Sequence, residues 1–179
     1  MAQHLVITAI GTDRPGIGNK IIHLVSELGC NIVDSRIALF GNDFTLIMLI
    51  SGTLSQITRV EHSLPQLGQQ HDLITMVKRT STHSDLMQQF TLEANIQATD
   101  KIGLTEQVTH FFADKDIGIS SLSARTLTKE STEFGEDQFQ ITLSASLSEE
   151  YNLMQLQEDF TSLCDSLNVK GTLNFINNG

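Results

Sequence analysis

The sequence predicts an α+β protein built from two copies of one small module, each a four-stranded antiparallel sheet with two helices on one face. Three observations lead to this prediction. The motif Thr-Asp-Arg-Pro-Gly-Ile at 12–17 returns 87 positions later as Thr-Asp-Lys-Ile-Gly-Leu at 99–104. Each copy joins a segment of alternating apolar residues to an amphipathic segment. The same order of patterns then follows each copy, over far more residues than the roughly 20 to 50 of a solenoid repeat.

The first half begins with a strand, a helix and a hairpin. Apolar residues alternate over 5–10, and this strand is expected to stop at Gly11. Apolar spacings of three and four then predict a helix over 17–28. Two β-rich runs, 32–40 and 44–51, flank a short Gly-Asn-Asp loop, which is typical of a hairpin.

The first half ends with a second helix and a last strand, and the second half repeats the whole order. The helix covers 57–67, and Pro65 is expected to break or kink it. The strand covers 73–78. We expect a linker at 81–84, which divides the chain into modules 1–80 and 85–179. The elements expected in the second module are 90–96, 103–115, 119–127, 139–147, 153–167 and 169–176. This order is the ferredoxin-like, split βαβ arrangement.

Charge is distributed unevenly between the two halves. Residues 1–84 carry 6 Lys and Arg against 6 Asp and Glu, whereas residues 85–179 carry 5 against 15, which accounts for the net charge of −10. An acidic surface repels a polyanion, so we expect no direct binding to DNA or RNA. This excess of acidic residues either serves solubility or attracts a basic protein partner. The Glu-rich loop at 128–137 contributes to the excess.

The sequence offers no catalytic or metal-binding motif. Its histidines form no HxxxH or HExxH pattern, and no CxxC, GxSxG or Walker motif is present, so we predict neither an enzyme nor a metal or cofactor site. Cys30 and Cys164 are expected in the core, and His23 and His110 on the surface. No signal peptide and no apolar stretch of about 20 residues is found, which favours a cytoplasmic protein.

The turn between the first strand and the first helix is the candidate ligand site. Asp13 can accept hydrogen bonds from backbone N–H groups, Pro15 fixes φ, and Gly16 permits close approach to the backbone. Unpaired N–H groups at a helix start carry partial positive charge and suit a small carboxylate. A plain helix cap, which needs only the Asp and the Gly, is the alternative explanation.

Two motifs carry a resemblance to a known family. The sequences D-R-P-G-I at the first turn and G-C-N-I-V-D-S after the first helix resemble the ACT domain, a module that binds amino acids and regulates other proteins or attached enzymes. In the second copy Ile102 replaces Pro15, and Gly118 replaces Asn31. The resemblance implies ligand-binding residues in both turns and at the start of the second strand: Asp13, Arg14, Pro15, Gly16, Ile17, Asn31, Asp100, Lys101, Gly103 and Leu104.

The tandem arrangement resembles that of ACT repressors of transcription. This resemblance implies an amino-acid-responsive negative regulator that acts through a protein partner, a LysR-type activator, with glycine as the effector and with no direct DNA binding. The alternative is a sensor related to the ACT modules of uridylyltransferase or formyltetrahydrofolate deformylase. Those parents carry catalytic domains, whereas the last strand expected here ends at Ile176, three residues before the end, which favours the regulator. Homo-oligomers are compatible with both functions.

Overall fold

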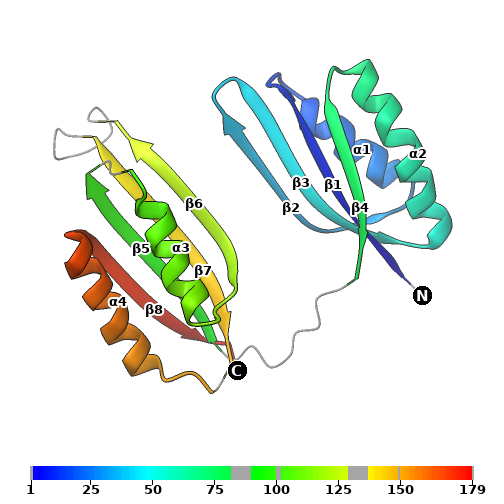
Figure 1. Cartoon of the computed structure of the whole chain (residues 1–179). Coiled ribbons are helices and arrows are strands. Elements are labelled where there is room, and N and C mark those ends of the chain that lie inside the picture. Colours follow the sequence, from blue (N-terminus) through cyan, green and yellow to red (C-terminus); the bar gives the residue numbers. More distant parts are fainter. Residues whose placement is uncertain (1, 82–89, 100–101, 129–136, 149, 179) are drawn as a thin grey trace. The chain divides into compact units, whose positions relative to one another are not determined.

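The computed structural model describes residues 2–81, 90–99, 102–128, 137–148 and 150–178. The chain divides into two compact units, Met1–Ser84 and Asp85–Gly179. Each unit has the element order β, α, β, β, α, β, with one four-stranded antiparallel sheet and both helices on one face of it (Figure 1). The predicted fold class, two tandem ferredoxin-like modules, is therefore confirmed.

The two modules have equivalent topology. The first consists of β1 (Gln3–Thr12), α1 (Ile17–Glu27), β2 (Asn31–Phe40), β3 (Asp43–Gly52), α2 (Leu54–Gln70) and β4 (Ile74–Thr80). The second consists of β5 (Phe90–Thr99), α3 (Leu104–Asp114), β6 (Ile119–Leu127), β7 (Gln138–Leu147), α4 (Leu153–Leu167) and β8 (Lys170–Asn177). The strand orders are β2-β3-β1-β4 and β6-β7-β5-β8, so the first strand of each module is central.

The core of the first module lies between the sheet and its two helices. Leu5, Ile7 and Ala9 on β1 are fully buried because alternate residues of a strand point to the same face. They pair with buried apolar residues of β3, and α1 and α2 cover them with their own apolar stripes. The helix residues of this core are Ile17, Ile21, Val25, Ile57, Val60 and Leu64.

The second module builds the same core with larger side chains. Phe112 on α3 and Phe160 on α4 are almost completely buried, and Phe111 meets Phe112 edge to face at 5.1 Å between ring centroids. Lys115 lies 5.0 Å from the centre of the Phe111 ring and pairs with Asp159 of α4. The hydrogen bond from Lys115 to Asp159 lowers the pKa of the Asp159 carboxyl and joins α3 to α4.

An ion pair holds α2 of the first module against the edge strand β4. The Arg79 guanidinium donates to both carboxylate oxygens of Glu61, at 2.8 and 2.7 Å. This bidentate geometry lowers the pKa of the Glu61 carboxyl. The start of α2 is fixed by a capping box between Thr53 and Gln56.

The first strand does not stop at Gly11 as predicted. β1 continues through Gly11, which pairs with Phe44 of β3, to Thr12. A Cβ at Gly11 would come within 2.6 Å of the Leu73 side chain and 2.8 Å of the Asp72 carbonyl oxygen. The glycine therefore permits close approach of the β4 entry loop rather than ending the strand.

The second helix does not break at Pro65. α2 runs five residues further, to Gln70, with Leu64 and Gly68 buried on either side of the proline. Pro65 itself lies on the exposed side of the helix. Water can satisfy the carbonyl that loses its helical donor there, and the buried contacts on the opposite side keep the backbone helical.

Other expectations about single residues agree with the structure. Cys30 and Cys164 are buried free thiols, and desolvation raises the pKa of each. His23 and His110 are more than two-thirds exposed. Among the described residues, no helix combines the length and the apolar character needed to cross a bilayer.

The packing of β8 predicts different effects for two glycine substitutions. A Cβ at Gly171 would lie 2.3 Å from the Cys164 sulfur and 3.0 Å from the Phe160 ring, both buried, whereas a Cβ at Gly118 would meet nothing within 4 Å. Gly171→Ala should therefore lower the free energy of unfolding by about 1 to 3 kcal/mol. Gly118→Ala, the matched control, should be neutral or slightly stabilising. Urea unfolding of both variants measures this, and equal stabilities would contradict the packing described.

Candidate functional site

The candidate site is the turn that connects β1 to α1. The Asp13 N–H donates to the Asn42 carbonyl at 3.0 Å, which ties the turn to the β2–β3 hairpin. The Ile17 N–H donates to the Arg14 carbonyl at 3.1 Å. Gly16 is the N-cap of α1 with φ 83° and ψ 0°, a left-handed conformation that strongly favours glycine. The glycine of the motif is therefore required by the backbone itself.

The start of α1 has no side-chain cap. A helix cap by Asp13, the alternative explanation of this turn, does not form, because Gly16, three residues later, occupies the N-cap position without a side-chain hydrogen bond. The N–H groups that a capping side chain would engage belong to Gly18 and Asn19. They carry the positive end of the helix dipole, so this helix start offers donors to a small anion.

Arg14 connects the turn to the second helix of the module. Its Nη2 donates to the backbone carbonyl of His71, the C-cap residue that follows α2. Beside this contact lies a shallow groove of about 310 Å³ between α1 and α2. Residues of both helices and the following loop line this groove: Asn19, Lys20, His23, Leu67 and His71. Lys20 and His71 escaped the sequence analysis because His71 lies 57 positions from Arg14, and no local pattern links them.

The predicted site residues of the first module do not form one cluster. Asp13, Arg14, Pro15 and Gly16 lie together on the exposed turn. The Ile17 side chain is only 3 % exposed and belongs to the core, so Ile17 offers a ligand only its backbone. Asn31 begins β2 beyond the far end of α1, an 11-residue helix. At 1.5 Å per residue, that helix separates Asn31 from the turn by about 16 Å.

The second module repeats the backbone of this turn but not its chemistry. Gly103 is the N-cap of α3 with φ 84° and ψ 0°, again without a side-chain cap. Leu104 is fully buried, as Ile17 nearly is, and Ile102 is fully exposed in place of Pro15. Asp100 and Lys101 lie outside the described residues. A polar pocket of about 350 Å³ lies at the adjoining strand ends, lined by Gln97, Ala98, Thr99, Gln138, Asn168, Val169 and Lys170.

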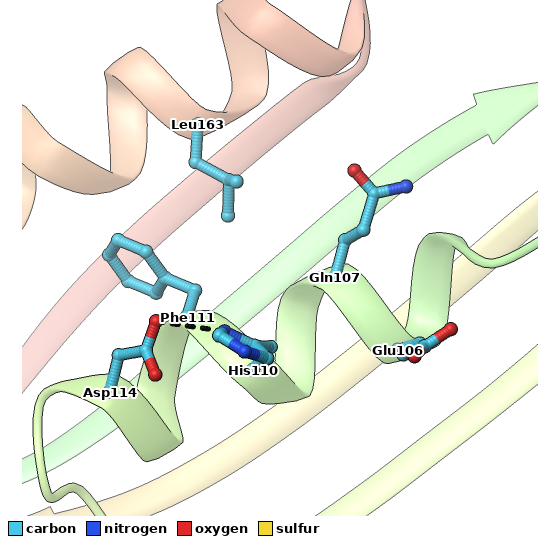
Figure 2. Close-up of a pocket in the computed structure, with 6 residues that line it drawn as sticks. All are labelled: Glu106, Gln107, His110, Phe111, Asp114 and Leu163. Atoms are coloured by element: carbon cyan, nitrogen blue, oxygen red, sulfur yellow. Dashed lines mark ion pairs between the residues drawn. The ribbon is translucent and has the colours of Figure 1, made fainter.

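A further groove, of about 440 Å³, runs along α3 where α4 faces it. Figure 2 shows Leu163 of α4 extending toward the side chains of α3. His110 Nδ1 lies 2.8 Å from Asp114 Oδ2, one helical turn along (Figure 2). The remaining lining residues are Glu106, Gln107 and Phe111. Two carboxylates beside a half-buried aromatic ring suit a basic, partly apolar segment of another protein.

The α1–α2 groove differs from this one in charge. At the 87-residue offset, Asn19 corresponds to Glu106 and Lys20 to Gln107. The groove beside the first turn therefore carries a cation, and its counterpart on α3 carries an additional carboxylate. One surface suits a small carboxylate ligand, and the other suits a cationic partner.

The fold of the two modules, with a glycine at the N-cap of each first helix, is that of an ACT-domain protein. Residues 3–78 match the family model of the ACT domain. The chain is 37 % identical over 177 residues to the glycine cleavage system transcriptional repressor of Escherichia coli strain K12, covering 98 % of this chain and 92 % of that protein. The Shigella flexneri protein of that name matches equally. The chain therefore belongs to the family of glycine cleavage system transcriptional repressors.

Solved structures agree with this assignment. A crystal structure described as a putative glycine cleavage system transcriptional repressor is 57 % identical, has a TM-score of 0.74 and covers 99 % of both chains. A protein of unknown function from Galdieria sulphuraria has the same TM-score at 21 % identity, which shows a shared fold. The family supports a regulatory role for this chain, and its curated members are named as repressors rather than enzymes.

Proposed function

We propose that this protein is an amino-acid-responsive negative regulator of transcription that acts by binding a LysR-type activator of glycine cleavage genes, with glycine as its effector. The observation that carries the proposal is near full-length similarity to repressors named for the glycine cleavage system. The tandem ACT fold supports it, because this class of module couples binding of a small molecule to control of a partner. We also propose that the protein works in the cytoplasm and does not itself bind DNA.

Glycine fits the chemistry of the first turn. An amino acid is a zwitterion, so its site needs donors for a carboxylate and an acceptor for an ammonium group. The uncapped start of α1 supplies N–H donors, with Arg14 and Lys20 as nearby cations. Asp13 supplies a carboxylate on the same exposed turn. A ligand without a side chain can lie directly against Gly16, where a Cβ would meet no protein atom within 4 Å.

The second module fits contact with the activator. It carries the whole excess of negative charge, and described carboxylates at Glu106, Asp114, Glu158 and Asp165 are exposed on α3 and α4. Opposite charge across an interface mainly accelerates and orients encounter. The acidic loop expected at 128–137 lies largely outside the described residues, so the proposal depends on the helices.

The first test is calorimetric titration of the full chain with glycine and other small amino acids. Glycine should bind, and Gly16→Val should abolish the measurable heat because its Cβ branches occupy the approach to the helix start. Gly103→Val is the matched control, because Gly103 has φ 84°, close to the 83° of Gly16, and equally open surroundings. A valine therefore causes equal backbone strain at either position.

The control should bind glycine normally, because the second module lacks the counterparts of Pro15 and Lys20. Circular dichroism checks that both variants remain folded. If the two variants lose binding equally, or neither loses it, the first turn is not the site.

The second test concerns the activator. Glu106→Gln combined with Asp114→Asn should slow association with the purified LysR-type activator, and the difference should shrink as salt rises. Glycine binding at the first turn should be unchanged. Surface plasmon resonance at low and high salt measures the association rate.

The control variant is Glu27→Gln, the equivalent of Asp114 on α1 of the neutral module. It should associate at the wild-type rate. Normal capture by the α3 variant at low salt, or a shift of promoter DNA by this chain alone, would refute the proposed route. An enzyme-associated sensor, the alternative function, also predicts amino-acid binding but no capture of an activator.

A further inference from the structure

The two modules differ most on the sheet face that carries no helices. In the first module this open face presents apolar residues from three strands: Val6, Ile10, Ile47, Leu49, Ile74 and Met76. Side chains of Ile47, Met76 and Ile74 are 49, 67 and 73 % exposed. An antiparallel sheet with one solvated face normally alternates apolar and polar residues. Apolar residues on both faces indicate that the open face is covered in the working protein.

The second module supplies an internal control for this interpretation. Its strands pair in the same register, so each position has an exact structural equivalent. All six apolar residues of the open face are replaced there by polar ones, in the same order: Glu93, Gln97, Thr142, Ser144, Lys170 and Thr172. The fold therefore does not require apolar residues at these positions, and their presence in the first module has another cause.

The distribution of charge favours a second copy of the chain as the partner that covers this open face. The first half is neutral, with 6 basic and 6 acidic residues, so two copies can approach through it without net repulsion, whereas the second half carries the excess of ten negative charges. The charged residues of the apolar face lie on its edge strands, where Asp34 and Arg36 of β2 neutralise one another at 3.2 Å. The polar sheet face of the second module would lose its hydrogen bonds to water against this apolar surface.

The open face is also large enough for a stable dimer interface. Four strands about 4.8 Å apart, up to about ten residues long at about 3.3 Å per residue, present a face of about 600 Å². Two such faces together bury about 1,200 Å², which reaches the range of stable protein interfaces.

We propose that the protein forms a homodimer in which the open sheet faces of two first modules pack on one another, with Ile47, Ile74 and Met76 at the contact. This assembly goes beyond the proposed function and does not depend on it.

Sedimentation equilibrium of the full chain tests the proposal. The wild-type chain should have twice the 19.8 kDa mass of one chain at micromolar concentration. Ile47→Thr combined with Met76→Thr installs the residues found at the same positions of the second module, so the fold should tolerate both. The dimer dissociation constant should rise on the order of a hundredfold or more, because four apolar side chains per dimer lose their burial.

The matched control is Leu54→Thr combined with Met154→Thr, which removes exposed apolar residues of similar size from helices α2 and α4. Its dissociation constant should equal that of the wild type. A monomeric wild type would overturn the proposal. If the sheet-face variant of that monomer were also less stable, the open face would be covered by another part of the same chain and not by a second copy. A dimer that resists the sheet-face substitutions would overturn it as well.

Discussion

Both modules depend on one constraint, the burial of alternate residues of a four-stranded sheet beneath two helices. Leu5, Ile7 and Ala9 in the first module, and Leu92, Ala94 and Ile96 in the second, are all at most 1 % exposed. A slip of one residue in register would turn these side chains out of the core, so the alternation fixes the pairing of each central strand with its neighbours. Burial of these alternate residues also fixes where each central strand ends and where the following turn begins.

The turn is where this common framework allows the two modules to diverge. Gly16 and Gly103 have the same left-handed conformation, and each begins a helix without a side-chain cap. Only the first turn is accompanied by Pro15 and by Lys20 one helical turn later. The proposed division of labour follows from this difference: the first module senses an amino acid, and the acidic second module meets the activator.

Periodicity predicted the fold because the burial of each element repeats at short sequence intervals. Expectations failed where packing against other parts of the module decides the outcome. Gly11 stays within its strand because it pairs with Phe44 of β3 and leaves room for Leu73, and Pro65 stays within its helix because Leu64 and Gly68 are buried beside it. For the same reason, the turn motif could be found by its spacing, whereas the contact of Arg14 with His71 could not. The separation of Asn31 from the turn became visible only in the folded module.

The central claim is that a small amino acid binds the helix start of the first module and not that of the second. Nuclear magnetic resonance of the ¹⁵N-labelled chain tests it directly, because each turn contains its own glycine amide. Titration with glycine should move the resonances of Gly16 and Gly18 in a saturable manner and leave that of Gly103 unchanged. Movement of Gly103 without Gly16, or no saturable change at either turn, would contradict the account.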